Sequence, residues 1–429
     1  MKITIIGGGG VRVPLLVNGL TQSDLPIDDI ALFDVDAERA AAIAPLAARF
    51  ARTARLRVES SVEQAIRGAS FVIISLRVGG SERRARDEHI ALAHGVIGQE
   101  TVGAAGFAMA FRTVPAVVGY ARDVERFAPD AWIVNFSNPV GITSQAVTAA
   151  SGSRVVGVCD TPTELFEEIA HAIERPSGEC DFDYFGLNHL GWVREVYHNG
   201  TPQLSRLWND PQRLERLYRA NLFDPIQLCA RRLLPTEYVF YYECRDHALR
   251  NMVNAGQSRG GVVDDLNRRL FVDLRDSSND PVQVYERYLA ARDAGYMQIE
   301  SGAPEPLVRS PWAALTGYDK IAVQTIRAIH GDSQESIPLN VVNGRAIEDL
   351  EPADVVEVPC NVGAQGARPR RVGQLPDVVA DLVRQVKRYE RLTVAAALSQ
   401  DRRAAVQALA ANPLVPDAET AQQLADALL

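Results

Sequence analysis

A cysteine and a histidine that follow two short apolar segments are the strongest candidates for metal chemistry in this sequence. Cys159 and Asp160 end one β-branched run, and His189 lies in the segment Leu187-Asn188-His189-Leu190-Gly191-Trp192 after another. A thiolate and an imidazole suit a borderline transition metal, and two protein ligands leave coordination positions open for substrate oxygens. Spacing alone leaves the more ordinary interpretation open, which is a buried cysteine and a satisfied histidine.

Four consecutive glycines at residues 7–10 follow a first apolar segment and precede a helix-like stretch. In that context, glycines let the backbone approach a pyrophosphate, which lies at the positive end of the helix. Asp34 ends a second apolar segment, where an acid accepts hydrogen bonds from ribose hydroxyls and favours NAD over NADP. The loop residues expected to hold NAD are Gly7, Gly8, Gly9, Val11 and Arg12. A purely structural turn is the alternative.

Polar side chains also follow the next apolar segments. Arg77 comes after the third segment, and Asn135 and Asn138 belong to the Asn-Phe-Ser-Asn-Pro turn after the fourth. Parallel α/β sheets bind ligands at the carboxyl ends of their strands. We therefore expect these side chains to face the nicotinamide and the substrate.

Two further segments combine reactive side chains with an ordinary structural interpretation. The basic run at residues 83–86, which includes Arg84, suits a bidentate phosphate clamp, although such runs are most often solvated helical faces. Residues 235–242 contain three tyrosines, among them Tyr238 and Tyr241, which by default form an aromatic cluster at the edge of a core. Both interpretations stay open at this point.

The composition is that of a globular protein with a small-molecule partner. The 429 residues are 47% hydrophobic and carry a net charge of -9, which argues against nucleic acid or an acidic membrane as the main partner. No apolar run approaches the roughly 18–20 residues that a membrane span requires. The five cysteines are few and widely spaced, so we expect no disulfide framework and a reducing cytoplasmic location.

Strand-like and helix-like segments alternate over the first part of the chain. Predicted strands are Ile3–Ile6, Asp29–Phe33, Phe71–Ser75, Ala131–Phe136 and Val155–Val158; predicted helices are Pro14–Leu20, Ala37–Ala51, Val62–Arg67 and Thr113–Phe127. The alternation predicts an α/β fold, with a Rossmann-type doubly wound parallel sheet over residues 1–160. Residues 161–429 are predicted to form an α+β domain for substrate, metal and oligomer contacts.

Seven ordered motifs together resemble glycoside hydrolase family 4, whose members depend on NAD and manganese. The motifs are Gly-Gly-Gly-Gly-Val-Arg-x-Pro, Arg-Val-Gly-Gly, Gly-Gln-Glu-Thr-x-Gly, Asn-Phe-Ser-Asn-Pro, Cys-Asp-Thr-Pro, Leu-Asn-His-Leu-Gly-Trp and Pro-Thr-x-Tyr-x-x-Tyr-Tyr. They cover roughly residues 3–320, and the branch that they resemble most is the bacterial 6-phospho-β-glucosidases.

The resemblance implies a role for each matching residue. Cys159 and His189 are implied to bind a divalent metal, usually Mn²⁺, and Tyr238 is implied to be the base, with Tyr241 as the neighbouring alternative. Glu100 is implied to orient the cofactor and the substrate. The residues implied to bind the substrate are Asn138 and Asn188 at the sugar hydroxyls, and Arg84 and Arg259 at the phosphate.

The implied reaction is a hydrolysis in which NAD⁺ is recycled. NAD⁺ takes hydride from C3 of the sugar, and the metal polarises the resulting ketone so that a tyrosinate removes the C2 proton. The aglycone leaves C1, water adds, and the hydride returns. The implied substrate is a phosphorylated disaccharide or β-glucoside 6-phosphate, and the implied assembly is a homodimer or homotetramer.

Three departures from the family pattern keep alternatives open. Asp160 resembles the phospho-α-glucosidase branch, where an aspartate is a proposed general acid, while Phe136 and the tyrosine motif favour the β branch. Ala104 and Ala105 replace the usual loop residues, and the later Gly-Gly-x-Tyr-Ser region appears only as Leu-Thr-Gly-Tyr-Asp at residues 315–319. A 6-phospho-α-glucosidase, a dehydrogenase of the malate or lactate type, and a non-catalytic NAD sensor remain alternatives.

Overall fold

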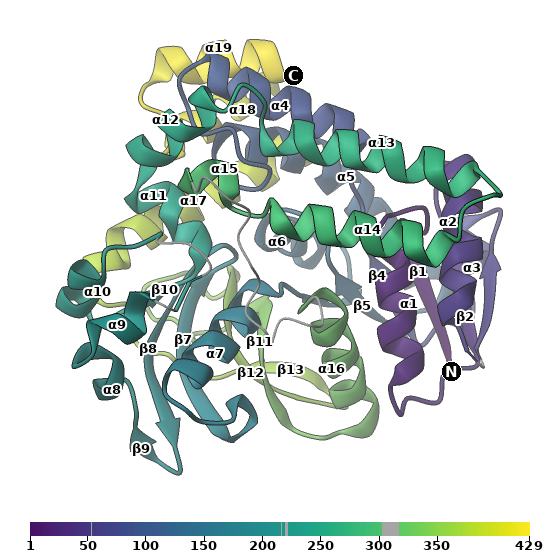
Figure 1. Ribbon diagram of the computed structural model, residues 1–429, viewed down its shortest axis with the longest axis horizontal. Coiled ribbons are helices and arrows are strands. Elements are labelled where there is room, and N and C mark those ends of the chain that lie inside the picture. Colours follow the sequence, from purple (N-terminus) through teal and green to yellow (C-terminus); the bar gives the residue numbers. More distant parts are fainter. Residues whose placement is uncertain (53, 216, 219–221, 303–316) are drawn as a thin grey trace.

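A central parallel sheet organises the protein. The computed structural model describes residues 1–52, 54–215, 217–218, 222–302 and 317–429 (Figure 1). Its six parallel strands are β1 (Lys2–Ile6), β2 (Asp29–Phe33), β3 (Arg55–Val58), β4 (Phe71–Ile74), β5 (Trp132–Asn135) and β6 (Arg154–Gly157). They lie in the order β3-β2-β1-β4-β5-β6, which is that of a dinucleotide-binding Rossmann sheet. The predicted Rossmann-type fold is therefore confirmed.

The strand β3 is the one parallel strand that the sequence pattern missed. Its sequence Arg-Leu-Arg-Val has a charged residue at every second position, and the strand lies at the edge of the sheet with partly exposed side chains. The central strands are different: Ile5, Ile73 and Val134 have no exposed surface. Helices cover both faces of a parallel sheet, so its central strands become continuous apolar runs, whereas an edge strand need not.

The connecting helices agree with most of the predicted ranges. They are α1 (Val13–Gln22), α2 (Ala37–Phe50), α3 (Val62–Ile66), α4 (Gly80–Ala93), α5 (Gly103–Phe127), α6 (Val140–Ala150) and α7 (Thr161–Ala172). Helix α5 begins at Gly103 instead of at the predicted Thr113. Ala104 and Ala105 are therefore buried in a helix and do not form a loop over the nicotinamide.

Helix α5 is the one helix among the described residues that is long and apolar enough to cross a membrane by composition. It has 25 residues and a mean hydropathy of 1.2 in its most apolar window, which the expectation of no such run overlooked. Of that window, 72% is buried inside the protein. The helix packs on α6 and on the C-terminal helix α17 (Asp377–Ser399), as a core helix does.

Three antiparallel strands from the second half of the chain extend the Rossmann sheet. They are β11 (Glu335–Val342), β12 (Val355–Gly363) and β13 (Gly366–Pro369). Strand β11 pairs with β6 where Asn340 lies opposite Gly157, so the nine-stranded sheet continues across the predicted boundary at residues 160 and 161. The division into domains 1–160 and 161–429 stays a prediction, and the sheet itself is shared between the two parts.

A second, smaller antiparallel sheet packs against this extension. It contains β7 (Cys180–Leu187), β8 (Leu190–His198), β9 (Thr201–Pro202) and β10 (Leu234–Pro235), and β7 lies against β12. The hairpin loop between β7 and β8 is Asn188-His189. This short turn carries two of the predicted site residues to the carboxyl edge of the Rossmann sheet.

Helices complete the second half of the chain. They are α8 (Ser205–Trp208), α9 (Pro211–Glu215), α10 (Pro225–Arg231), α11 (Phe240–Glu243), α12 (Arg245–Asn254), α13 (Arg259–Arg275), α14 (Pro281–Ala294), α15 (Gln298–Ser301), α16 (Gly317–Gly331), α18 (Arg402–Ala411) and α19 (Ala418–Leu428), with short 3-10 turns at Ser177–Glu179 and Glu237–Val239. Figure 1 shows α13 and α14 running side by side, and α13 packs on α4. Residues 315 and 316 of the segment 315–319 lie outside the described residues.

Candidate active site

The structure brings Cys159 and His189 together at the end of β6. The Cys159 Sγ lies 3.4 Å from the His189 Nε2, and both side chains are buried. Burial lowers the pKa of His189 to about 4, although Asp160 and Glu100 act in the opposite direction, so the ring is neutral at physiological pH. A neutral imidazole beside a thiol is the donor set of a divalent transition-metal site. The two residues, called here the Cys–His pair, therefore fit the predicted metal.

A hydrogen-bond chain fixes which nitrogen of His189 is free. The Thr101 hydroxyl donates to the Gln99 side-chain carbonyl at 2.9 Å, so it accepts a hydrogen bond from the His189 Nδ1 at 2.8 Å. The Nε2 consequently carries the lone pair and faces Cys159. A partner that fixes the tautomer in this way is typical of metal-binding histidines.

The backbone at His189 is strained. Its φ of +63° lies in the left-handed region that residues other than glycine rarely adopt. Such a conformation costs of order 1–3 kcal/mol and persists at functional sites that the surrounding structure holds in place. In this hairpin loop, it aims the imidazole at Cys159 and under Tyr238.

The ring of Tyr238 stacks directly on the ring of His189. The two centroids are 3.8 Å apart and the planes differ by 7°. Burial raises the pKa of Tyr238, while its hydrogen bond with Tyr296 acts in the opposite direction. Tyr241 lies further away, 1% exposed, with its hydroxyl on the Met297 sulfur at 3.5 Å. The geometry therefore favours Tyr238 as the reactive tyrosine.

The glycine loop at residues 7–10 follows the carboxyl end of β1, and three sets of hydrogen bonds fix its conformation. Asp34 accepts a hydrogen bond from the Gly9 amide at 2.8 Å, so this predicted ribose ligand also holds the loop. Tyr285 of α14 donates to the Val11 carbonyl at 2.7 Å and packs α14 against the loop. Gly7 and Gly8 both donate to the Phe33 carbonyl, which fixes the turn between β1 and α1.

Arginines and carboxylates gather at the ends of β4 and α4. Glu100 lies between Arg77 at 2.5 Å and Arg84 at 2.6 Å. Burial favours neutral Glu100, but the charges of Arg77 and Arg84 outweigh burial and hold the pKa of Glu100 well below its ordinary value. Arg84 also pairs with Glu88 at 2.7 Å and is 6% exposed. Within the run at residues 83–86, Arg84 is therefore not part of a solvated face, because it has two buried carboxylate partners, whereas Arg86 is exposed.

Two further arginines face this cluster from α13 and α14. Burial, followed by the charges of Arg292 and Arg84, lowers the pKa of Arg259. Arg259 donates to the Arg292 carbonyl, and Arg292 donates to the Tyr288 hydroxyl at 2.9 Å. Within the described ranges, neither Arg259 nor Arg292 pairs with a carboxylate. We call Arg77, Arg84, Arg259 and Arg292 the arginine cluster.

Sequence reasoning missed Arg292. It lies in the helical segment Pro281–Ala294 without a recognisable motif, and only its tertiary position against Arg259 marks it. The one signal in the sequence is Tyr288, four positions before Arg292 and therefore one helical turn away, whose hydroxyl accepts a hydrogen bond from Arg292. That signal is common on ordinary helices and would not have singled it out.

The three predicted asparagines have different surroundings. Asn135 is fully buried, and its side-chain amide hydrogen-bonds Thr143, Ser144 and the Ser137 backbone, so it shapes the turn; its contact with the cofactor stays a prediction. Asn138 is half-buried and precedes a cis Pro139. Asn188 donates to Glu357 at 3.2 Å, a buried carboxylate on β12 that the sequence did not single out.

Asp160 lies beside the Cys–His pair at the start of α7. Its nearest cationic partner is Arg12 of the glycine loop at 4.0 Å, and its side chain is 28% exposed. Burial, then the charges of Glu357 and Asp160, raises the pKa of the Cys159 thiol. Asp160 is thus close enough to act on the metal site and accessible enough to meet a ligand.

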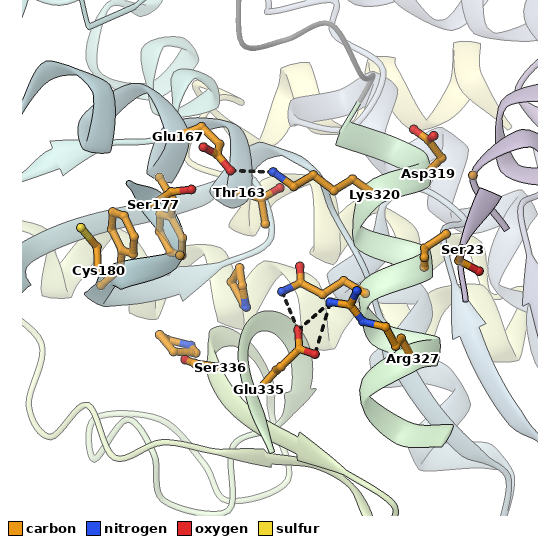
Figure 2. Close-up of a pocket in the computed structure, with 18 of the residues that line it drawn as sticks. Ser23, Thr163, Glu167, Ser177, Cys180, Asp319, Lys320, Arg327, Glu335 and Ser336 are labelled. Carbon is orange, nitrogen blue, oxygen red and sulfur yellow. Dashed lines mark hydrogen bonds and ion pairs between the residues drawn. The ribbon is translucent and has the colours of Figure 1, made fainter. Parts of the chain in front are cut away.

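One surface pocket of the described residues lies away from this site. It has a volume of about 770 Å³ and lies between α1, α7, α16 and β11. Figure 2 shows two ion pairs in it, Lys320 with Glu167 and Arg327 with Glu335. Cys159, His189, Tyr238 and the arginine cluster do not line it, so we do not place the chemistry there.

Comparison with known proteins identifies the family. Residues 2–175 match the sequence model of family 4 glycosyl hydrolases, and residues 184–415 match that of the family 4 glycosyl hydrolase C-terminal domain. The chain belongs to glycosyl hydrolase family 4. The predicted family is confirmed. Dehydrogenases of the malate or lactate type, the predicted alternative, are similar to this chain only in their Rossmann fold.

Similar proteins come from both anomeric branches of the family. The 6-phospho-beta-glucosidase of Escherichia coli (strain K12) is 30% identical over 99% of this chain and 94% of its own length. The 6-phospho-beta-glucosidase structure from Thermotoga maritima with manganese, NAD⁺ and glucose-6-phosphate has a TM-score of 0.84 and 28% identity, covering 100% of this chain and 98% of that one. A 6-phospho-alpha-glucosidase structure from gut microorganisms, with NAD and glucose-6-phosphate, has a TM-score of 0.85 and 27% identity over 100% and 97%.

Proposed function

We propose that this family 4 enzyme is a 6-phospho-β-glucosidase that uses NAD⁺ and a divalent metal, Mn²⁺ by preference. The observation that carries the proposal is the stack of Tyr238 on His189, directly beside Cys159, within reach of the arginine cluster. A tyrosine base, a soft metal site and a cationic anchor occur there together. This combination suits a phosphorylated sugar and removal of a carbon-bound proton.

Arginines without carboxylate partners are the best candidates for holding the sugar phosphate. Arg84 is already paired with Glu88 and Glu100, whereas Arg259 and Arg292 carry unpaired charge. A dianionic phosphate relieves the repulsion between these two guanidinium groups. We therefore assign the main phosphate contacts to Arg259 and Arg292, and a supporting contact to Arg84.

The remaining residues position the sugar between the arginine cluster and the Cys–His pair. When bound, the metal supplies Lewis acidity at Cys159 and His189, and NAD⁺ supplies a hydride acceptor above the glycine loop. Tyr238 accepts the proton at C2 of the sugar, and a cation beside its ring favours the tyrosinate that this step needs. Asn138 and Asn188 are placed to bind hydroxyls.

Asp160 supports the 6-phospho-α-glucosidase as a second candidate. Its partly exposed carboxylate lies beside the Cys–His pair, where a general acid can protonate the leaving oxygen of an α-glucoside. The β assignment rests on 6-phospho-beta-glucosidases that are 30% identical to this chain and on the tyrosine motif. Asp160→Asn distinguishes the two candidates. If Asp160 is a required general acid, its loss should abolish activity on substrates whose aglycone is a poor leaving group.

A panel of four nitrophenyl glucosides tests the proposal. The α- and β-anomers, each with and without the 6-phosphate, are incubated with the protein, NAD⁺ and Mn²⁺. The proposal predicts release of nitrophenol from the β-glucoside 6-phosphate only. Cleavage of the α-anomer instead supports the second candidate, and equal cleavage of unphosphorylated sugars contradicts the role of the arginine cluster. A homodimer or homotetramer and a cytoplasmic location stay predictions.

A further inference from the structure

Glu357 of β12 is a buried carboxylate that the proposed reaction has not yet used. Its side chain is 1% exposed, and no arginine or lysine pairs with it among the described residues. Three side chains donate hydrogen bonds to it instead: Tyr184 at 2.7 Å, Asn340 at 2.7 Å and Asn188 at 3.2 Å. Burying a carboxylate without a cation is costly, even with such donors. Burial raises the pKa of Glu357 to about 7 although its three hydrogen-bond donors act in the opposite direction, so the carboxylate is charged above that pH and a nearby divalent cation would favour the charged form.

Two glycines near Glu357 leave the space that its hydrogen-bond donors occupy. A Cβ at Gly191 would lie 2.0 Å from the Tyr184 hydroxyl, so glycine is required for that hydroxyl to reach Glu357. A Cβ at Gly157 would lie 2.8 Å from the Asn340 Cβ, so the end of β6 is also kept clear. The network is therefore part of the sheet edge that carries Cys159.

Glu357 also determines how the Asn188 amide is turned. A carboxylate oxygen that accepts from Asn340 and Asn188 requires the amino group of Asn188 to face it. The amide oxygen of Asn188 then points away from Glu357, and no hydrogen-bond donor among the described residues occupies it. Asn188 directly precedes His189 in the hairpin loop, so its amide is held on the same short turn as the metal-site histidine.

The charge of Glu357 reaches the metal site as well. Its hydrogen-bond partner Asn340 lies opposite Gly157 of β6, two residues before Cys159, so the carboxylate lies at the sheet edge that carries the thiol. A thiolate and a neutral imidazole offer only one negative charge to a divalent cation. A second fixed negative charge close by compensates the remaining charge without being a ligand, and in a buried site that attraction is strong.

We propose that Glu357 is a positioning residue that supplies the second negative charge of the Cys159–His189 metal site and holds the Asn188 amide oxygen towards it. The proposal deepens the proposed function, because it rests on the divalent metal of that function. It assigns a role in metal retention to a strand more than a hundred residues downstream of the motifs.

The test is the affinity of the protein for Mn²⁺, measured by the electron paramagnetic resonance signal of the free ion in the presence of NAD⁺. Glu357→Gln can keep all three hydrogen bonds, with its amide oxygen towards the asparagines and its amino group on Tyr184, but removes the charge. The proposal predicts a Kd for Mn²⁺ that rises about 10- to 100-fold. The Kd for NAD⁺ and the Tm should stay close to the wild-type values.

Tyr184→Phe is the matched control, since it removes one hydrogen bond to Glu357 and leaves the charge and Asn188 in place. Its Mn²⁺ affinity should stay within about threefold of wild type. The activity lost in Glu357→Gln should return as the Mn²⁺ concentration is raised, which a packing defect would not allow. Wild-type Mn²⁺ affinity in folded Glu357→Gln overturns the proposal.

A second variant keeps the test available if Glu357→Gln does not fold. Glu357→Met combined with Tyr184→Phe and Asn340→Leu replaces the network by apolar side chains, an exchange that buried networks often tolerate. The same loss of Mn²⁺ affinity is expected, and unchanged affinity again contradicts the proposal. A wild type that binds Mn²⁺ but cleaves no glucoside 6-phosphate defeats the proposed function only; a wild type that binds no Mn²⁺ defeats this inference.

Discussion

The Cys–His pair and the arginine cluster both interact with Tyr238 and are built with opposite charges. Around the Cys–His pair, Glu357 and Asp160 add negative charge, and the hydrogen-bond donors of the Glu357 network are used. In the arginine cluster, Glu88 and Glu100 pair with Arg84, whereas Arg259 and Arg292 form no ion pair with a carboxylate of the described residues, and the buried Glu300 acts on Arg259 only electrostatically. One region has surplus negative charge, and the other has surplus positive charge.

The opposite charges of the two regions explain how one active site can bind a divalent cation and a phosphate at a fixed distance from each other. The buried anions favour a divalent metal, and the unpaired arginines favour a phosphate. A sugar 6-phosphate whose ring hydroxyls reach the metal spans the two regions. Tyr238 interacts with both regions. Its ring stacks on His189, and its phenol group interacts electrostatically with Arg84.

The largest expected effect comes from removing the thiol. Cys159→Ser replaces a soft ligand by a hydroxyl that stays protonated, so hydrolysis in the presence of Mn²⁺ should fall by about 1,000-fold or more. The Kd for NAD⁺, measured by fluorescence titration, should not change. Cys180→Ser is the control, because Cys180 is far from the Cys–His pair, at the start of β7. Full activity of Cys159→Ser would mean that the region of negative charge holds no metal.

The next effect tests the region of positive charge. Arg292→Gln removes one unpaired guanidinium, and loss of a charged hydrogen bond to phosphate should lower kcat/KM for the glucoside 6-phosphate by about 10- to 100-fold. Most of that loss should appear in KM. Arg268→Gln on the same side of the protein is the control, since Arg268 is 70% exposed. Equal losses in both variants would contradict the assignment of Arg292.

The pH dependence of metal binding separates the two regions. The pKa of the Cys159 thiol is raised by burial and by Glu357 and Asp160, so the metal-free protein carries the proton and must release it on binding. Below the pKa of the thiol, Mn²⁺ affinity should therefore rise about tenfold per pH unit. Above the pKa of Glu357, which burial raises to about 7, isothermal titration in buffers of different ionisation enthalpy would report one proton released. Affinity that falls with rising pH would contradict a thiolate ligand.

The smallest effect distinguishes the two tyrosines. Tyr241→Phe removes a hydroxyl that contacts Met297, and it should change kcat by less than about threefold while costing about 1 kcal/mol of stability. Tyr238→Phe, by contrast, should abolish turnover without preventing Mn²⁺ binding. If Tyr241→Phe were the inactive variant, the stack on His189 would not identify the base.

The sequence predicted the residues whose position follows from strand ends. Cys159 follows a buried apolar strand of the parallel sheet, at the edge where ligands bind. His189 lies in the two-residue hairpin loop of the second, antiparallel sheet, and the packing of β7 on β12 brings it to the same edge. The strand β3 was missed because its alternating charges make it unlike a buried strand. The length of α5 was missed because Gly and Ala near its start resemble a loop.

Tertiary contacts could not be predicted in this way. Glu357 reaches Asn188 because β12 joins the Rossmann sheet through β11, a pairing between segments far apart in the sequence. Arg292 reaches Arg259 because α14 packs along α13. Asn135 matched a motif, yet its amide is used inside its own turn. Local patterns locate strand ends, but they do not show which distant side chain completes a site.

The central claim is that hydrolysis here proceeds through removal of the C2 proton by Tyr238 between the two charged regions. The most direct measurement is to run the reaction on a β-glucoside 6-phosphate in D₂O with NAD⁺ and Mn²⁺ and to analyse the sugar product by NMR. The account predicts one deuterium at C2 of the glucose 6-phosphate and no accumulation of NADH. A product with hydrogen fully retained at C2 would contradict it.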